Sequence, residues 1–403
     1  MSKSIKYLTT VISVTLGLRL FSMSIIIPFL SAYAMNLKGG SPALTGYALG
    51  IFGLTQAVLQ IPFGVLSDRI GYKKVMLAGL VMLIAGLLTA AYATSIGWLI
   101  FARALQGSGA IVTVGYSWLS SVSGDAERDK ILTKLGALLA TFTMLSYVLG
   151  PLVHIVLNVS QMFVFSAILI VGCFIWVLTS TKQVNPALRK EYAQKHKVKS
   201  VFNISHLSKS LILTFNNFLM MAFFFMLPLL LEGNLATNQI WIVLSPSILI
   251  AVGVLPYFSK QASKANAKKV LTVLFLLIAV GFFSIYFRTV VSVICGTILL
   301  MVGLLSISSI VPMLINREMD NRQRGKGNGV MVSLQYFGSF LGAAVTGKLW
   351  GWGLVVAFGF VGAVIFAGII LTNLESKPSN LPLEIETKYE TQPQPASKRR
   401  YKP

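Results

Sequence analysis

Charged side chains are scarce in this sequence, at 11% of its 403 residues. A soluble globular protein normally has about 25%, so the composition argues against a sizeable soluble domain. Hydrophobic residues instead make up 55% of the chain, and the mean hydropathy is +0.76. Because a helix needs about 20 apolar residues to cross a bilayer, this composition predicts an all-α membrane protein with many spans.

Residues that carry chemistry are scarce as well. The two cysteines, Cys173 and Cys295, lie inside apolar runs, which indicates small buried side chains rather than a disulfide or a metal site. The phosphate-binding pattern G-x-x-x-x-G-K-[ST] does not occur, which argues against a nucleotide site of that type. We find no nucleophile or metal-ligand constellation, so we expect neither an enzyme nor a bound cofactor.

Twelve apolar runs are long enough to cross a membrane as helices. Lys3 and Lys6 precede the first run, but that run is far longer than the roughly 7–15 apolar residues of a signal peptide, so we expect it to be retained. The twelve predicted spans cover residues 7–35, 43–66, 75–94, 97–122, 131–157, 161–180, 210–231, 237–258, 270–287, 290–315, 328–347 and 352–373.

Basic residues outnumber acidic ones by 34 to 12, which gives a net charge of +22. With the N-terminus in the cytoplasm, 29 of the 34 fall in cytoplasmic segments, Lys38, Arg288 and Lys348 fall outside, and Arg19 and Arg103 fall within spans. Short cytoplasmic loops of membrane proteins carry such an excess of Lys and Arg. The charge therefore predicts that both termini are cytoplasmic, and no nucleic-acid partner is needed to explain it.

The chain divides into two similar halves. Residues 1–180 and 210–374 each hold six predicted spans, residues 181–209 form a basic linker, and residues 375–403 have the polar composition of a disordered tail. Residues 61–63 and 73–74 (Ile-Pro-Phe, Lys-Lys) have counterparts at 255–257 and 268–269 (Leu-Pro-Tyr, Lys-Lys). This echo is short enough to arise by chance, but it fits a duplicated six-helix unit.

One short charged segment separates the second and third spans. Residues 64–74 read G-V-L-S-D-R-I-G-Y-K-K, and this spacing resembles the signature loop of the major facilitator superfamily of transporters. The resemblance implies twelve helices in two pseudo-symmetric six-helix bundles. It also implies a conformational switch in which Asp68 lies beside the positive end of the eleventh helix, near residues 327–329. The switch residues are then Gly64, Asp68, Arg69, Gly71, Lys73, Lys74 and Arg128.

This segment departs from the family pattern at Tyr72, where a basic residue is usual, so one ion pair of the switch is expected to be missing. Arg69, Lys73 and Lys74 are expected to lie on the cytoplasmic side and to contact the loop between the fourth and fifth spans, around Arg128. The alternative is that Asp68 is a solvated acid in a turn and has no functional role.

The fourth span carries Arg103, Gln106, Gly107 and Gly109 in the spacing R-x-x-Q-G-x-G-A, which resembles the fourth-helix motif of the same family. An arginine inside a span usually faces a cavity or a partner. The alternative is that Arg103 lies near the span end and extends to water. In the fifth span, only Gly150-Pro151 matches the family's antiporter motif, which is a weak indication of antiport and predicts close helix packing in either case.

The first 110 residues resemble the YajR branch of the superfamily, through Arg19, residues 47–57 and residues 60–64. The resemblance implies a bacterial inner-membrane protein and a proton-coupled drug exporter. Members of that branch can carry a small soluble C-terminal domain, which we do not expect in this chain.

No acidic residue falls in the middle of a predicted span, where proton-coupled transporters usually place a carboxylate. The remaining candidates for a proton carrier are Asp68, Glu232 and His154. For His154, the alternative is a purely structural role. Because the spans hold Arg19 and Arg103 without a carboxylate, we expect a neutral or anionic substrate. The residues expected to line the substrate or proton pathway are Arg19, Gln56, Gln60, Arg103, Gln106, Tyr147, His154, Asn216, Asn217 and Gln335.

Three functions stay open at this point. The first is proton-coupled efflux of small molecules by alternating access, the second is an uncoupled facilitator or importer, and the third is a membrane sensor that does not transport. In each case we expect a monomer whose partners are the lipid bilayer and, for a transporter, a small-molecule substrate.

Overall fold

The computed structural model describes residues 3–123, 125–181, 204–263, 267–319 and 324–374. Most of the predicted linker and the whole predicted tail lie outside these residues. Within them, twelve helices are long and apolar enough to cross a membrane, which confirms the predicted spans. The helices of the first half are α1 (Lys3–Ser24), α2 (Ile27–Met35), α3 (Pro42–Ile70), α4 (Tyr72–Ala91), α5 (Ile96–Ser108), α6 (Val112–Val122), α7 (Asp125–Val156) and α8 (Val159–Ser180).

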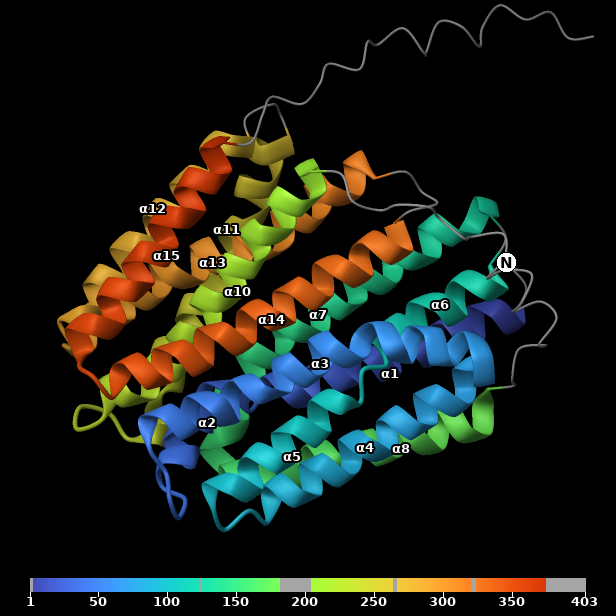
Figure 1. Ribbon diagram of the computed structural model, residues 1–403, viewed down its shortest axis with the longest axis horizontal. Helices are drawn as coiled ribbons and strands as arrows, with labels where there is room; N and C mark the ends of the chain where they lie inside the picture. Colours follow the sequence, from blue (N-terminus) through green and yellow to red (C-terminus); the bar gives the residue numbers. More distant parts are fainter. Residues whose placement is uncertain (1–2, 124, 182–203, 264–266, 320–323, 375–403) are drawn as a thin grey trace, which may run out of the picture.

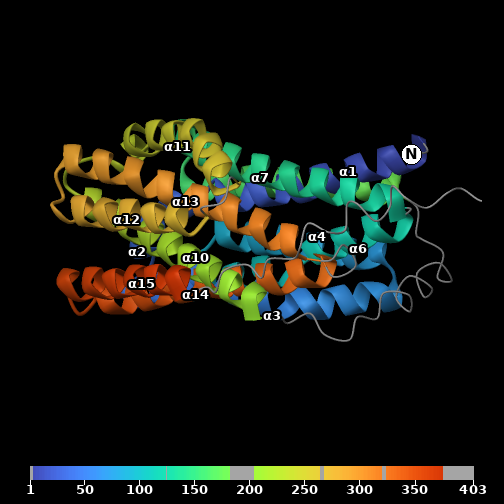
Figure 2. The same ribbon diagram turned by 90° about the horizontal axis from the view of Figure 1, so that it is seen from above.

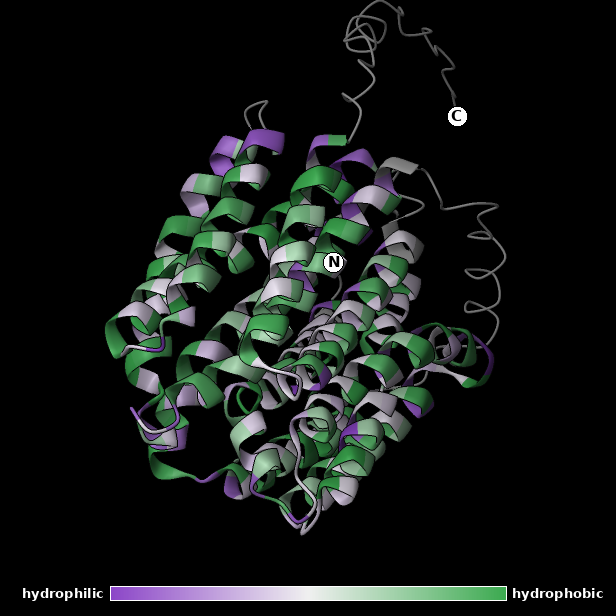
Figure 3. Ribbon diagram, turned by 60° about the vertical axis from the view of Figure 1, so that its left-hand side comes forward, coloured by the Kyte–Doolittle hydropathy of each residue, from purple (hydrophilic) through white to green (hydrophobic). Residues whose placement is uncertain are grey.

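The second half begins with α10 (Ile204–Leu231) and continues with η1 (Thr237–Gln239), α11 (Trp241–Gln261), α12 (Ala267–Tyr286), α13 (Val290–Glu318), α14 (Arg324–Trp350) and α15 (Leu354–Leu374). Figure 1 shows the two halves side by side, and Figure 2 shows α12, α13 and α15 on one side and α1, α3 and α4 on the other. Figure 3 shows hydrophobic residues mainly along the helices and hydrophilic ones mainly toward their ends. This is the predicted all-α membrane fold.

We name the two ends of the bundle after the glycines that lie there. The Gly71 end holds the turn between α3 and α4, and the Gly39 end holds the turn between α2 and α3. Lys209, predicted to close the linker, belongs instead to α10 at the Gly71 end, where its Nζ lies 2.5 Å from Oε2 of Glu318 in α13. Burying that ammonium group is feasible because the carboxylate compensates its charge.

The charged segment 64–74 is more helical than the sequence predicts. We expected a turn along its length, but α3 continues to Ile70 and α4 begins at Tyr72, so that the connection is Gly71 alone. Gly71 has φ +111°, a conformation that only glycine adopts without strain. Asp68 therefore lies in the last turn of α3, because charged residues can continue a helix once it leaves the hydrocarbon core.

Two spans are broken in the middle. The first is interrupted between Ser24 and Ile27, and α2 restarts with Pro28 in its first turn, where the missing N–H of proline does no harm. The fourth is interrupted around Gly109, between α5 and α6. Such breaks leave backbone groups without helical partners, and in membrane proteins they are tolerated where protein groups satisfy them.

Helices α3 and α14 join the two halves in antiparallel contact. A Cβ on Gly46 would overlap the Ala343 carbonyl, and one on Gly53 would lie 2.5 Å from the Tyr336 carbonyl oxygen. Small residues of this kind let membrane helices approach closely. The two backbones therefore touch from the Gly39 end to the middle of the bundle.

Candidate functional site

A buried polar cluster lies at mid-depth in the first half, and Arg19 of α1 is its centre. The side chain of Arg19 is 0% exposed. Its Nη2 donates to Oε1 of Gln56 at 2.6 Å and to the carbonyl of Gly109 at 3.0 Å. The break between α5 and α6 leaves the Gly109 carbonyl outside a regular helix, so this local irregularity supplies one of the two acceptors.

Two glutamines one helical turn apart continue the cluster along α3. Nε2 of Gln56 donates to Oε1 of Gln60 at 2.7 Å, and both side chains are fully buried. The spacing of four residues places them on one face of the helix. The backbone carbonyl of Gln60 accepts from Thr113 Oγ1 of α6 at 2.9 Å, which ties this turn of α3 to the broken fourth span.

Arg103 lies in a second polar contact, between α3, α4 and α5. Its Nη1 donates to Oε1 of Gln106 at 2.7 Å, and its Nε lies 3.4 Å from the Ala48 carbonyl. Gln106 in turn donates to the Gly86 carbonyl at 2.9 Å. Since Arg103 is 2% exposed, the alternative that it extends to water is wrong, and its partners are backbone and amide groups of the first half.

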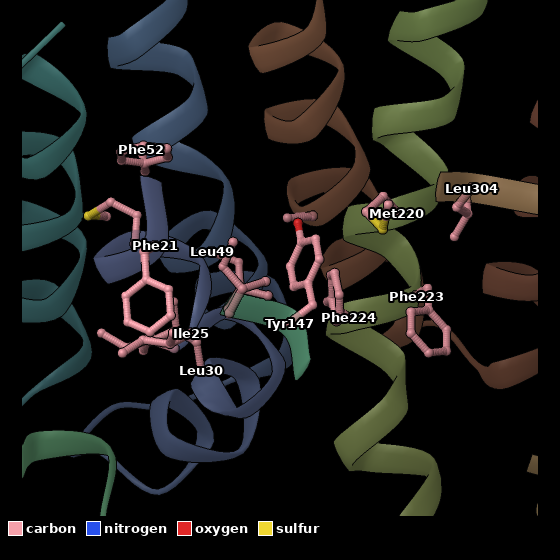
Figure 4. Packing of buried hydrophobic residues seen from close by; sticks show 14 of the residues in the cluster. Phe21, Ile25, Leu30, Leu49, Phe52, Tyr147, Met220, Phe223, Phe224 and Leu304 are labelled. Carbon is pink, nitrogen blue, oxygen red and sulfur yellow. The ribbon is translucent and has the colours of Figure 1, made fainter. Parts of the chain in front are cut away.

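Aromatic rings connect this region to the second half. The guanidinium carbon of Arg103 lies 4.9 Å from the ring centroid of Phe52, and the Phe52 ring meets that of Tyr336 of α14 edge to face at 5.8 Å. The hydroxyl of Tyr336 lies within hydrogen-bonding reach of Arg19 and close to Tyr147. Figure 4 shows Tyr147 between the blue helices of the first half and α10, beside Phe224. The ring centroids of Tyr147 and Phe224 are 5.3 Å apart.

The switch residues gather at the Gly71 end. The Tyr72 hydroxyl donates to Oδ1 of Asp68 at 3.1 Å, and the Tyr72 ring is buried against Trp118. Gly64 and Gly329 both lie beside Thr113, so the first turns of α14 run next to this part of α3. Arg69 and Lys74 are exposed, and Asp68 is half-buried.

Lys73 corrects one sequence expectation. We expected it to contact the loop between the fourth and fifth spans, but its Nζ binds the carbonyls of Leu178 at 2.8 Å and Thr181 at 2.6 Å. These are unsatisfied carbonyls at the end of α8, and a cation there is favoured by the helix dipole. Arg128 donates from Nε to the Ser120 carbonyl at the end of α6, at 3.3 Å.

Comparison with known proteins decides the family. The family model for the Major Facilitator Superfamily matches residues 12–343. The chain belongs to the major facilitator superfamily. It is therefore a multi-pass membrane transporter of small molecules rather than an enzyme.

This superfamily member is similar to known proteins in sequence and, separately, in fold. Inner membrane transport protein YajR of Escherichia coli K12 is 33% identical over 352 residues, which cover 83% of this chain and 75% of YajR. The multi-drug resistance efflux pump PmrA of Streptococcus pneumoniae is 30% identical over 140 residues, a third of each chain. The crystal structure of a D-xylose-proton symporter has a TM-score of 0.72 at 14% identity and covers 93% of this chain and 98% of its own.

Two predicted pathway residues lie apart from the Arg19 cluster in this transporter. His154 stacks on Phe29 with ring centroids 4.1 Å apart, and its Nδ1 lies 3.0 Å from the Leu157 carbonyl. Asn216 donates to Leu304 and Ser308 of α13. His154 therefore resembles a structural histidine near the Gly39 end, and Asn216 joins two helices within the second half.

The remaining predicted glycines are packing positions in the structure. A Cβ on Gly107 would overlap Thr55 and Phe52, one on Gly109 would lie 2.5 Å from the Gly79 carbonyl, and one on Gly150 would lie 2.8 Å from the Ile25 carbonyl. Gly150 and Pro151 lie within α7 without ending it. Asn217 bonds to Leu213 of its own helix.

Sequence reasoning missed Tyr336 and chose its neighbour Gln335. Successive residues of a helix point about 100° apart, so the two side chains have different neighbours. The aromatic neighbours of Tyr336 come from α3 and α7, and this proximity is not encoded locally. Among the described residues, no group of three or more His, Cys, Asp or Glu side chains could hold a metal ion.

Proposed function

We propose that this transporter exports small molecules as a secondary carrier driven by the proton gradient. The observation that carries the proposal is the polar cluster of Arg19, Gln56 and Gln60, which lies at mid-depth beside Tyr336 of the other half. Polar groups are expensive at this depth and usually mark a transport pathway. A site shared by both halves can be exposed to either side as the halves tilt, which is alternating access.

Export is the direction that the relatives favour. PmrA is called an efflux pump, and its similarity to this chain supports efflux of drug-like molecules. We place the transporter in the bacterial inner membrane with the Gly71 end and both termini in the cytoplasm, because the basic residues are concentrated there. We propose a monomer that needs no cofactor, with the lipid bilayer and the small-molecule substrate as its partners.

We also propose that the Gly71 end is the conformational switch. Asp68 lies in the last turn of α3, one turn after Gly64, and Gly64 and Gly329 of α14 both lie beside Thr113. The positive end of that helix would stabilise a carboxylate. Loss of this contact is expected to favour separation of the halves at the Gly71 end, with a coupling of roughly 1–3 kcal/mol.

An uncoupled facilitator is the second candidate. The observation in its favour is that, in the described helices, acidic residues lie only near helix ends or in turns, as Asp68, Glu127, Glu232 and Glu318 do. A mid-depth carboxylate is the usual proton carrier in coupled transporters. A facilitator needs none.

Flux measurements with purified protein in liposomes distinguish the candidates. The probes are radiolabelled benzenesulfonate and the cationic dye ethidium. For proton-coupled efflux, we expect an acidic interior to drive uptake of one probe above equilibrium, and a protonophore to abolish that uptake. An uncoupled facilitator would equilibrate the probe at the same rate with or without the pH step.

The controls separate transport from leakage and from a sensor role. Liposomes without protein define the leak, and Asp68→Asn protein tests the switch. Accumulation under an acidic exterior instead would overturn antiport in favour of symport. Absence of protein-dependent flux for either probe, with no effect of Asp68→Asn or Arg103→Ala on cells, would contradict transport of these classes.

A further inference from the structure

Arg19 offers more hydrogen-bond donors than its protein neighbours accept. A guanidinium has five N–H groups, one on Nε and two on each Nη. The two on Nη2 bind Gln56 and Gly109, which leaves the three N–H groups of the buried Nε and Nη1. The Tyr336 hydroxyl lies within hydrogen-bonding reach of the guanidinium and can accept from one of these three, so at least two of them have no acceptor among the described residues.

The donors of Arg19 also fix the orientation of both glutamines. Oε1 of Gln56 must accept from Arg19, so the Gln56 amide group donates to Oε1 of Gln60. This leaves Nε2 of Gln60 as a second buried donor without a partner. The hydrogen-bonding groups that the cluster leaves unused are therefore N–H donors, and a ligand that satisfies them must carry hydrogen-bond acceptors.

The charge of the cluster points the same way. In the described part of the chain, no carboxylate contacts Arg19, and the acids lie near the ends of the bundle. A buried cation without a counter-ion is costly, and a buried donor without an acceptor adds to that cost. Arg103 differs, because none of its nitrogens is buried without a partner.

Tyr336 of the second half lies beside this donor group and connects it to a row of aromatic rings. Phe52 meets Tyr336 edge to face, and Tyr147 lies between the Tyr336 hydroxyl and Phe224. Aromatic faces and edges favour an apolar or aromatic body. A small inorganic anion would satisfy the N–H groups but would make no use of these rings.

We propose that Arg19 and Gln60 bind the anionic group of an organic anion, and that Phe52, Tyr147 and Tyr336 contact its apolar body. This proposal rests on the transporter function proposed above and specifies its substrate class. The bound anion supplies the counter-charge that Arg19 lacks, and both halves contact it because Tyr336 belongs to α14.

The test compares three probes that share one ring and differ in charge. These are benzenesulfonate (negative), benzenesulfonamide (neutral) and phenyltrimethylammonium (positive), with sodium chloride as the inorganic anion. Binding to the purified full-length protein is measured by calorimetry and by the midpoint of thermal unfolding. We expect benzenesulfonate to bind and to raise the midpoint, and the other three to have little effect.

Variants of Arg19 then test whether this residue belongs to the benzenesulfonate site. We expect Arg19→Gln to weaken benzenesulfonate binding at least about tenfold, because charge-assisted hydrogen bonds are lost. Arg19→Lys keeps the charge without the planar donors and should bind with intermediate affinity, and it serves as the folded alternative if Arg19→Gln is unstable. Lys38→Gln removes an exposed positive charge at the Gly39 end and should bind like the wild type.

Several outcomes would overturn the proposal. Preference for the neutral or the positive probe contradicts an anion site, and an equal effect of chloride contradicts an organic anion. Unchanged benzenesulfonate binding in both Arg19 variants would show that the anion binds elsewhere in the protein. Binding is measured without a gradient, so a failure of proton-coupled flux would refute the proposed driving force while leaving this result intact.

Discussion

Tyr72 shows how one residue can change a family pattern without removing its contact. Where a basic residue is usual, the Tyr72 hydroxyl donates to Asp68 at 3.1 Å, while its ring stacks against Trp118. The ion pair that a basic residue would form here is replaced by a hydrogen bond from a neutral hydroxyl to the carboxylate. Such a bond is weakened less by salt than an exposed ion pair, because one partner carries no charge.

Replacing Tyr72 by Phe removes this hydroxyl and keeps the ring. We expect the free energy of unfolding to fall by about 1 kcal/mol, the usual size of one hydrogen bond, and benzenesulfonate binding to stay unchanged because Arg19 lies far along the bundle. Denaturant unfolding in detergent and calorimetry measure the two quantities.

Tyr33→Phe is the matched control for that variant. The Tyr33 hydroxyl donates to the Ala90 carbonyl at 3.3 Å and accepts from Ser160 Oγ at 3.3 Å, toward the Gly39 end. If Tyr72→Phe and Tyr33→Phe change probe flux equally, the contact with Asp68 has no special part in the switch.

At the scale of helices, the contact of α3 with α14 is the main connection between the halves. Gly46, Gly50 and Gly53 follow one face of α3, and a Cβ on Gly50 would lie 2.8 Å from the Phe340 carbonyl oxygen. Because this contact is between backbones, a side chain inserted there must separate the helices rather than rotate aside.

Gly46→Leu tests this contact at the Gly39 end. We expect the larger side chain to favour a state in which the halves separate there. Spin labels at exposed Lys38 and Lys348, one in each half, should show a longer distance by pulsed electron paramagnetic resonance. Gly253→Ala is the control, since nothing lies within 4 Å of its Cβ, and an unchanged distance in Gly46→Leu would contradict the role of the contact.

The two helix breaks were not predicted, although the spans that contain them were. Proline inside an apolar run is tolerated in membrane helices, so Pro28 did not predict an interruption of the first span, and Gly109 lies in the family's fourth-span motif. An apolar run of sufficient length predicts a crossing. It does not predict whether the backbone stays helical throughout, because neighbouring groups such as Arg19 decide whether a freed carbonyl is satisfied.

For the whole molecule, the distribution of basic residues predicts its orientation. We expect a cysteine at exposed Lys74 to be protected in intact cells and one at exposed Lys38 to react with an impermeant maleimide. Both are measured in a background with Cys173 and Cys295 replaced by serine. Permeabilised cells provide the control, and the opposite labelling pattern would place the Gly71 end outside.

The sequence by itself determined the class, the number of spans and the family, because hydrophobic length and loop charge are properties of each segment alone. It also identified Arg19, Gln56 and Gln60 as pathway candidates. Only the tertiary structure brought Tyr336 beside Arg19 and separated Asn216 and His154 from the cluster. It also showed which donors of Arg19 lack acceptors. Those facts depend on which faces of distant helices meet, and each helix sequence alone leaves that choice open.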